Sequence, residues 1–253
     1  MKTITLANQK GGCGKTTTAQ TLAIGLVNKG YKVLAIDCDP QCNLSSVFGI
    51  SPEDNGATLF EVMKGEKSLK ECVVSIRIGL DILPGSLFLN EADRTFTKPA
   101  TAPFILQRIV SKVSEWDFCI LDTAPSLGIM TINALIATDY LIIPMTPDYF
   151  TIQGLCQLKN NIEDVKEINE NLKVSGLLLT RCDRTSLTGM LKEDIATAAE
   201  TMGTKVFETT IRQGVAIRES QLLQSNIFEE SPKAAVTEEY SSFIDEFLRK
   251  EGL

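Results

Sequence analysis

The sequence predicts an α/β protein with a doubly wound, mostly parallel sheet flanked by helices, built as a single domain over residues 1–253. Apolar runs of strand length alternate with helical stretches along most of the chain, an alternation typical of parallel sheets covered by helices. The first forty residues contain a strand, a helix and a second strand, which predicts a right-handed unit with parallel strands. A chain of 253 residues can bury one full core, and no repeat, low-complexity tract or linker divides it.

The composition is that of an ordinary globular protein, with 43% hydrophobic and 23% charged residues. The net charge of −7, from 25 basic and 32 acidic residues, argues against nucleic-acid binding by bulk attraction. Any contact with DNA would therefore need a local basic patch.

Seven cysteines, an odd number spread through the chain, argue against a disulfide framework and indicate a reducing compartment. Cys38 and Cys42 are spaced like half of a metal site, but no histidine and no second such pair accompanies them, so we do not expect a cysteine metal site. No apolar run approaches the roughly 20 residues that span a membrane. Because the first residues already form a predicted strand, we expect no signal peptide and a cytoplasmic protein.

The first predicted unit is a strand over residues 3–7, a loop, a helix over 14–29 and a strand over 31–36. The helix has apolar residues at three- and four-residue spacing, which form a core-facing stripe. Lys29 and Gly30 give a last-turn cation and a terminal glycine, the expected end of a helix. The stripe consists of Ala19, Leu22, Ala23 and Leu26.

The loop at 8–17 has the composition of a phosphate cradle of the Walker A kind. Glycines permit a tight turn with inward N–H groups, and the following helix directs its positive end to the same point. Lys15 supplies a cation and Thr16 a hydroxyl for a metal. A second lysine, Lys10, stands where the usual motif begins with a glycine. The predicted phosphate-binding residues are Lys10, Gly11, Gly12, Cys13, Gly14, Lys15, Thr16 and Thr17.

Carboxylates follow two of the predicted strands. Asp37 and Asp39 end the second strand beside the phosphate loop, in the crevice where open α/β sheets bind ligands. The alternative is a polar turn, with Asp39 and Pro40 interrupting the chain before a helix. The apolar strand at 118–122 ends on Asp122, the Walker B pattern, and this carboxylate is expected to hold Mg²⁺ through a water opposite Thr16.

The remaining elements follow from apolar spacing and turn residues. We expect short helical pieces at 58–64 and 86–93, strands at 72–76 and 80–83, a surface loop at 95–103, a helix at 104–113 and a helix ending near 137. Further along we expect a strand at 140–145 followed by a long helix, a strand at 174–180, a helix at 187–202, a short strand at 205–207 and a closing helix at 235–250.

The closing helix permits two interpretations. Its apolar stripe, Val236, Tyr240, Phe243, Ile244 and Phe247, could lie on a membrane or pack on the domain. A lipid-binding helix normally has a basic polar face. The other face here carries four acids, so packing on the domain is favoured. These acids are Glu238, Glu239, Asp245 and Glu246.

Several motifs together resemble the deviant Walker A ATPases of the ParA/MinD group. They are the two-lysine loop at 10–17, the run from Asp37 through Asp39 to Gln41, and the run from Leu121 to Ser126. The segment GLLLTRCDRTSLT at 176–188 and the ending at 227–240 resemble the ParA/Soj branch. The resemblance covers nearly the whole chain and implies a P-loop ATPase without the N-terminal helix-turn-helix of some plasmid relatives.

This resemblance implies a slow, switch-like ATPase that uses ATP and Mg²⁺. In the family, ATP joins two subunits face to face, and the lysine matching Lys10 reaches the phosphates bound by the other subunit. Lys15 matches the lysine that holds the β- and γ-phosphates of its own subunit. Asp39 matches the aspartate that orients the attacking water. The candidate catalytic residues are therefore Lys10, Lys15 and Asp39, and the candidate metal residues are Thr16, Asp37, Asp39 and Asp122.

Other contacts are implied by the resemblance in the same way. Thr180, Arg181 and the turn around Arg212 match the positions that hold adenine. In the family the ATP-bound dimer binds DNA non-specifically, and a ParB-like centromere-binding protein stimulates hydrolysis. The predicted partners are thus a second copy, DNA and a ParB-like protein, with no membrane, and the ATP-bound form would associate with the nucleoid. The DNA-binding candidates are Arg184, Arg218 and Lys233.

The sequence departs from the family pattern where DNA contacts are expected. Arg218 lies two residues beyond the aligned position, and Lys233 lacks its usual basic neighbour. Fewer phosphate contacts predict weaker association that depends less on salt. Two other functions stay open: a membrane-associated positioning ATPase of the MinD type, and a metabolic ATPase of the same group.

Overall fold

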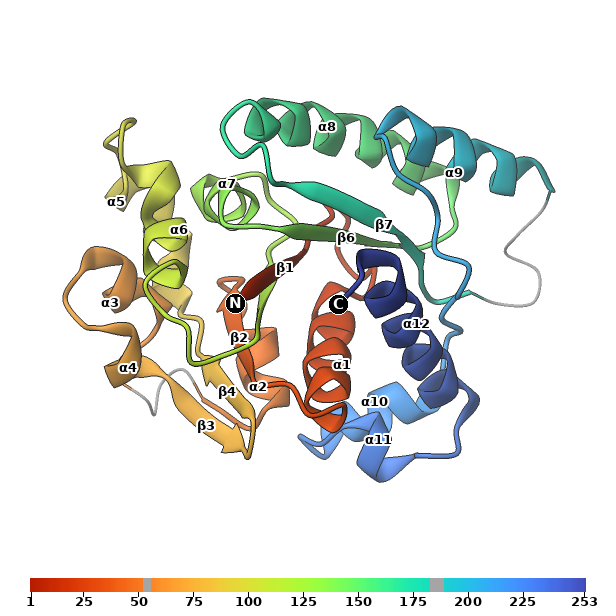
Figure 1. Ribbon diagram of the computed structural model, residues 1–253, viewed down its shortest axis with the longest axis horizontal. Helices are drawn as coiled ribbons and strands as arrows, with labels where there is room; N and C mark the ends of the chain where they lie inside the picture. The colour runs from red at the N-terminus through yellow and green to blue at the C-terminus, as the bar shows by residue number, and fades with distance from the viewer. Residues whose placement is uncertain (52–55, 183–188) are drawn as a thin grey trace.

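The structure is a computed structural model that describes residues 1–51, 56–182 and 189–253. Its centre is a seven-stranded sheet in the order β3-β4-β2-β5-β1-β6-β7 (Figure 1). All neighbouring strands run parallel except the β3–β4 pair. The predicted doubly wound, mostly parallel fold is therefore confirmed. The strands are β1 (Lys2–Leu6), β2 (Val33–Cys38), β3 (Val74–Arg77), β4 (Leu80–Leu83), β5 (Phe118–Thr123), β6 (Tyr140–Met145) and β7 (Lys173–Leu179).

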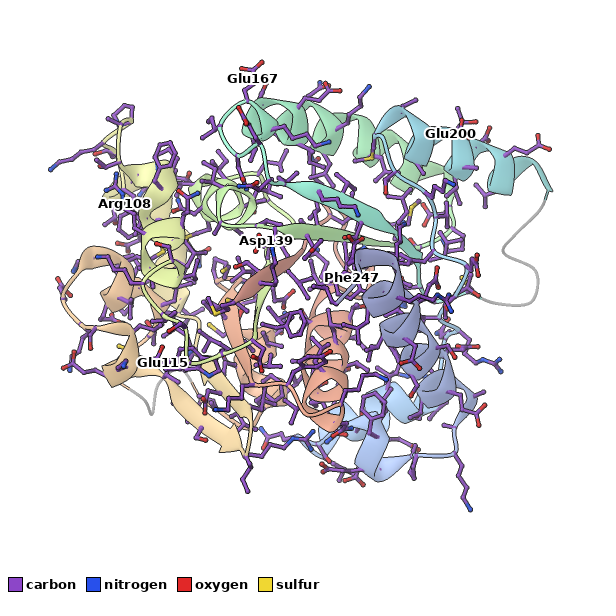
Figure 2. All side chains as sticks on the ribbon, viewed as in Figure 1. Arg108, Glu115, Asp139, Glu167, Glu200 and Phe247 are labelled. Carbon is purple, nitrogen blue, oxygen red and sulfur yellow. The ribbon has the colours of Figure 1, made fainter. Side chains whose placement is uncertain are left out.

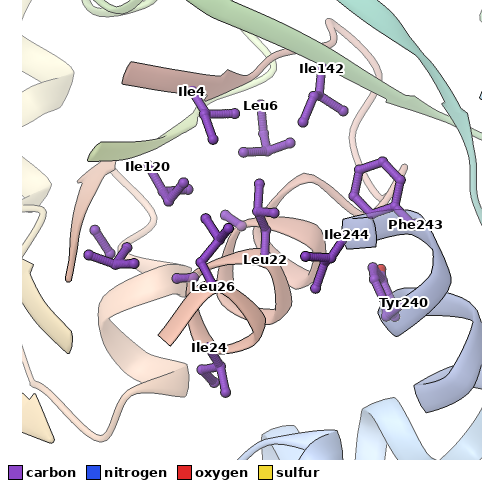
Figure 3. Close-up of a cluster of buried hydrophobic side chains, with 14 of the residues drawn as sticks. Ile4, Leu6, Leu22, Ile24, Leu26, Ile120, Ile142, Tyr240, Phe243 and Ile244 are labelled. Atoms are coloured by element: carbon purple, nitrogen blue, oxygen red, sulfur yellow. The ribbon is translucent and has the colours of Figure 1, made fainter. Parts of the chain in front are cut away.

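One face of the sheet is covered by helices from the two ends of the chain. Leu22 and Leu26 of α1 pack under sheet residues such as Ile4, as the predicted stripe requires (Figure 3). The aromatic side chains of α12 close the same core, and Phe243 is fully buried. The interpretation that the closing helix packs on the domain is thus confirmed. This face holds α1 (Lys15–Asn28), α2 (Asn43–Val47), α10 (Val215–Leu222), α11 (Ile227–Glu230) and α12 (Ala235–Glu251).

The other face is covered by the middle of the chain. Strand residues alternate between the two faces, so Leu34 and Ile36 of β2 and Leu121 of β5 point into this second core. Among the described residues, no helix is both long and apolar enough to cross a membrane. The helices here are α3 (Leu59–Lys64), α4 (Leu69–Cys72), α5 (Ala92–Thr95), α6 (Ile105–Val110), α7 (Ile129–Ile136), α8 (Tyr149–Lys166) and α9 (Gly189–Thr201), with 3₁₀ turns at Leu87–Glu91 and Ala102–Phe104.

The structure differs from the predicted elements in several places. The strand expected at 205–207 is a single bridge between Val206 and Leu177, because the chain leaves the edge strand β7 after one contact. Residue 72, expected to begin a strand, ends α4. Helices α10 and α11 were not predicted, since the segment is polar and lacks an apolar run. The strand β3 is antiparallel because only two residues connect it to β4.

Candidate functional site

The loop after β1 leads into a helix N-terminus that is open to an anion. Gly14 precedes α1 with φ of 85°, and Gly12 has φ of 73°; both lie in the left-handed region that favours glycine. None of the described side chains caps α1, and its first turn holds no acid. The first N–H groups of the helix are therefore available to a bound phosphate.

Other segments hold this loop by its carbonyl groups. The Thr180 hydroxyl donates to the Cys13 carbonyl at 2.8 Å, and Arg181 Nη1 donates to the Gly12 carbonyl at 2.8 Å. The Lys15 ammonium donates to the Lys10 carbonyl at 3.1 Å. These bonds do not use the N–H groups of the loop, so they shape it without competing with a phosphate.

A cavity of about 470 Å³ lies in front of the loop, a size that suits a small-molecule ligand. It extends from the loop to Asp39 on one side and to the turn at 211–214 and α10 on the other. The structure thus brings most of the sequence-predicted site residues to one cavity. Those that line it are Gly11, Gly12, Gly14, Lys15, Thr16, Thr17, Asp39, Thr180, Arg181 and Arg212.

Two predicted phosphate-binding residues do not line the cavity. Cys13 is fully buried, and burial raises the pKa of its thiol. Lys10 directs its ammonium to the Asp148 carboxylate and to the Thr146 hydroxyl, the latter at 3.1 Å. Both partners lie in the segment that follows β6, so Lys10 is bound to its own chain and not to the cavity.

Asp37 and Asp122 lie opposite each other on the neighbouring strands β2 and β5. Both are fully buried on the face of the sheet that α1 covers. Desolvation raises the pKa of Asp37 to about 6, although the Ser45 amide and hydroxyl donate to its carboxylate at 2.8 and 2.7 Å. Desolvation and then the Asp37 charge raise the pKa of Asp122 well above its usual range. Two buried acids this close favour a cation between or beside them.

The Asp122 carboxylate fits a magnesium site. Thr16 lies close enough to lower its pKa, yet neither carboxylate oxygen completes a hydrogen bond with any described residue. Residues 1–51, 56–182 and 189–253 contain no cluster of three or more His, Cys, Asp or Glu that would hold a metal alone. Mg²⁺ suits such a site, because it keeps several waters and needs only one or two carboxylates beside phosphate oxygens.

Gly85 and Ser45 support Asp37 and were missed by the sequence analysis. The Gly85 amide donates to Ser45 Oγ at 3.0 Å, and Ser45 Oγ donates to Asp37. A Cβ at position 85 would lie 3.0 Å from the Asp37 carbonyl and 3.2 Å from that of Asp39. The only sequence signal was a glycine two residues after a strand.

Two acids of α12 hold the turn beside the cavity, and these were also missed. The Glu246 carboxylate accepts the N–H groups of Glu208 and Thr209 at 2.7 and 2.9 Å. Glu239 accepts the Arg212 N–H at 2.8 Å and its Nε at 2.6 Å. Arg212 therefore lines the cavity while paired within its own chain. Acids on an amphipathic helix look like a solvent-facing surface, so no local pattern marks these two as buried or bonded.

The structure describes two of the three predicted DNA-binding residues. Arg218 is exposed on α10 and lines the same cavity as the phosphate loop. Lys233 is exposed just before α12. Arg184 lies outside the described residues, so the structure does not place it.

Comparisons with known proteins show which families this chain is similar to. A family model described as an AAA domain matches residues 1–174. The chain is 30% identical to the chromosome partitioning protein ParA of Caulobacter vibrioides, over 99% of this chain and 95% of that protein. It is 32% identical to the sporulation initiation inhibitor protein Soj of Bacillus subtilis, over 97% of each.

Solved structures are similar over the whole fold. Cobyrinic acid a,c-diamide synthase from Mycobacterium smegmatis, with bound ADP and magnesium, matches with a TM-score of 0.85 and 27% identity, over 100% of this chain and 96% of that chain. A plasmid partition protein from Borrelia burgdorferi matches with a TM-score of 0.76 and 26% identity, over 98% of each chain.

Proposed function

Because the chain belongs to the AAA-domain family and, within it, to the ParA/Soj partition ATPases, we propose that it is a DNA-segregation ATPase. In this proposal Mg-ATP joins two copies into a dimer that binds DNA without sequence preference. A ParB-like partner then stimulates hydrolysis, which releases the DNA. The observation that carries the proposal is the presence of two lysines on one phosphate loop, only one of which lines the cavity of its own chain.

The two lysines have different roles in this proposal. Lys15 holds the β- and γ-phosphates at the start of α1. Lys10 leaves Asp148 and reaches the nucleotide of the second copy, where its charge offsets charge developing on the transferred phosphoryl oxygens. A phosphate loop that acts alone has no use for this second cation.

Asp39 is the proposed positioning group for the attacking water. It is buried at the cavity wall, and its Oδ1 accepts the Gln41 N–H at 2.9 Å. None of the described residues bonds to Oδ2, so that oxygen is available to accept a hydrogen bond from the water. Mg²⁺, held by Thr16 and Asp122, would neutralise charge on the phosphate oxygens when bound.

Thr180, Arg181 and the turn at 211–214 form the proposed site for the adenine base. They line the end of the cavity away from the acids, and α12 holds the turn in place through Glu239 and Glu246. A base bound there would contact a preordered backbone, which reduces the cost of binding.

A DNA gel shift with ATP, with ADP and without nucleotide tests this function. We expect retardation with ATP only, weakening as salt rises, because phosphate contacts release counterions. Lys15→Ala is the matched control and should abolish the shift by preventing ATP binding. Retardation that is equal in all three nucleotide states would contradict an ATP-driven switch.

A metabolic ATPase is the second candidate, favoured by the TM-score of 0.85 with a cobyrinic acid a,c-diamide synthase. ATP turnover that requires a small-molecule acceptor and ignores DNA would support it. A MinD-type membrane function receives no support from α12, whose apolar stripe is buried in the core. Co-sedimentation with vesicles, with and without ATP, tests that alternative.

A further inference from the structure

Residues 94–114 carry four basic residues and no acid, in a chain whose other 232 residues carry 21 basic and 32 acidic residues. We propose that this segment is the surface that binds the phosphate backbone of duplex DNA. The proposal rests on the DNA association proposed above and places it on the face of the sheet opposite α12. The four cations are Arg94, Lys98, Arg108 and Lys112.

All four cations are exposed, and none is ion-paired with another described residue. The acids that directly flank the segment are occupied elsewhere. Asp93 accepts the Ile129 N–H at 2.8 Å, and Glu115 pairs with Lys70 at 2.5 Å. None of the four positive charges is therefore neutralised in an ion pair with a described residue, and they are available to an anionic partner.

The uncharged residues of the segment favour a phosphate backbone over a lipid surface. Hydroxyl groups stand between the cations, and protein contacts to DNA phosphates combine lysine and arginine with such hydroxyls. The apolar side chains point inward: Leu106 and Val110 are buried in the second core, and Ile109 packs against it. None of them is free to enter a bilayer. The exposed hydroxyl residues are Thr95, Thr97, Ser111 and Ser114.

The segment is supported by rigid elements. Helices α5 and α6 both pack against α7, and Lys112 lies in the turn that directly follows α6, four residues after Arg108. Figure 2 shows Arg108 on the flank of the molecule that carries α5 and α6, across the sheet from Phe247 of α12. None of the four cations lines the nucleotide cavity, so DNA bound here leaves that cavity open.

A contact also connects this surface to the nucleotide site. Asp93, the residue before Arg94, caps the first turn of α7 through the Ile129 N–H. Helix α7 follows the turn at 124–128, which begins directly after β5 and its Asp122. A change in that turn on ATP binding would therefore be passed to α5. This gives the DNA surface a physical route to nucleotide control.

The test compares two variants that remove the same charge. The first replaces Arg94, Lys98, Arg108 and Lys112 with alanine. The control replaces four cations elsewhere, Lys32, Lys166, Lys205 and Arg249. Binding of a fluorescent random-sequence duplex is measured with ATP across a salt series. We expect the first variant to lose affinity at least about tenfold, and its log–log salt slope to fall by about 3 to 4, since each phosphate contact contributes roughly 0.9.

The control variant should bind within about threefold of the wild type. Equal ATP affinity and equal melting temperature show that both variants are folded. If the four-alanine variant of the segment is unfolded, the double variant Arg108→Ala with Lys112→Ala replaces it and should still lower the log–log salt slope of DNA binding by about 2. Two results would overturn the placement of the DNA surface on residues 94–114: the control variant alone loses DNA binding, or the first variant binds DNA as well as the wild type does. Either result would leave the proposed function standing.

Two further results would overturn the inference in other ways. If the wild-type protein binds ATP but no DNA, both the DNA binding in the proposed function and the proposed DNA surface are contradicted. Retention on vesicles of anionic lipid but not on DNA, lost in the first variant, would identify a membrane surface instead.

Discussion

The ammonium of Lys10 is bound by the carboxylate of Asp148 in its own chain, although Lys10 belongs to the loop that would cradle phosphates. Thr146 joins this contact, because its hydroxyl donates to Asp148 at 2.6 Å and accepts from Lys10 at 3.1 Å. Lys15, five residues later, lies against the cavity instead. The two lysines of the loop are thus held apart, and only one is in place for phosphate in a single subunit.

Lys10→Ala should leave ATP binding nearly unchanged and reduce the rate of ATP hydrolysis by about 10³-fold. This is the lower end of the rate enhancement that a cation supplied by another subunit provides. Fluorescent-ATP titration and phosphate release measure the two effects. Lys29→Ala is the control, since Lys29 also pairs with an aspartate, Asp245, but lies outside the cavity. Unchanged turnover would remove the proposed role of Lys10.

Asp39→Ala should hold the protein as an ATP-bound dimer, because the nucleotide binds but the water is no longer positioned. Size-exclusion chromatography with ATP should show a dimer that persists, whereas the wild type returns to monomer as ATP is consumed. Asp245→Ala, which removes an exposed carboxylate, should behave as the wild type. A variant that stays monomeric with saturating ATP would contradict this assignment.

Glu246→Gln should loosen the turn that borders the cavity. The carboxylate accepts two backbone N–H groups and is almost fully buried, and an amide would direct donors toward one of them. We expect a loss of about 1–3 kcal/mol in the free energy of unfolding, measured by urea denaturation, and weaker binding of fluorescent ATP.

Glu238→Gln is the matched control, because Glu238 is exposed on the same helix. It should change the free energy of unfolding by less than about 0.5 kcal/mol. If Glu246→Gln lowers stability but leaves ATP affinity unaltered, the carboxylate stabilises α12 without positioning the base.

Much of the sheet could be predicted from the sequence, because its central strands are continuous apolar runs. Those at 118–122 and 140–145 match β5 and β6 within one residue. The phosphate loop and the acids at the strand ends could be predicted for a similar reason: their chemistry is encoded in short, contiguous motifs.

The rest depends on contacts between distant residues. Lys10 and Asp148 are 138 positions apart, and Thr209 and Glu246 are 37 apart, so no local pattern reveals either pair. Helix α10 has no strong apolar stripe, which is why it was missed. The strand expected at 205–207 had the right residues, but the tertiary path of the chain allowed only one bridge.

Gly85→Ala should disturb the acids of the site more than it disturbs the fold. A methyl group at this buried position would lie 3.0 Å from the backbone carbonyl oxygen of Asp37 and 3.0 Å from the carboxyl carbon of the Asp37 side chain. The carbonyl belongs to β2 and cannot rotate away, so the strand end or the Gly85 segment must shift. We expect a loss of about 1–3 kcal/mol in the free energy of unfolding, typical of overpacking.

The same change should lower ATP hydrolysis about tenfold or more, since small displacements of catalytic groups are costly. Gly154→Ala is the control: it lies within α8 with open space around its Cα, so alanine should stabilise the protein by roughly 0.5–1 kcal/mol. Phosphate release and urea unfolding on both variants separate the two effects. Full activity in Gly85→Ala would mean that Asp37 tolerates movement, and its support by Gly85 and Ser45 would then serve the fold alone.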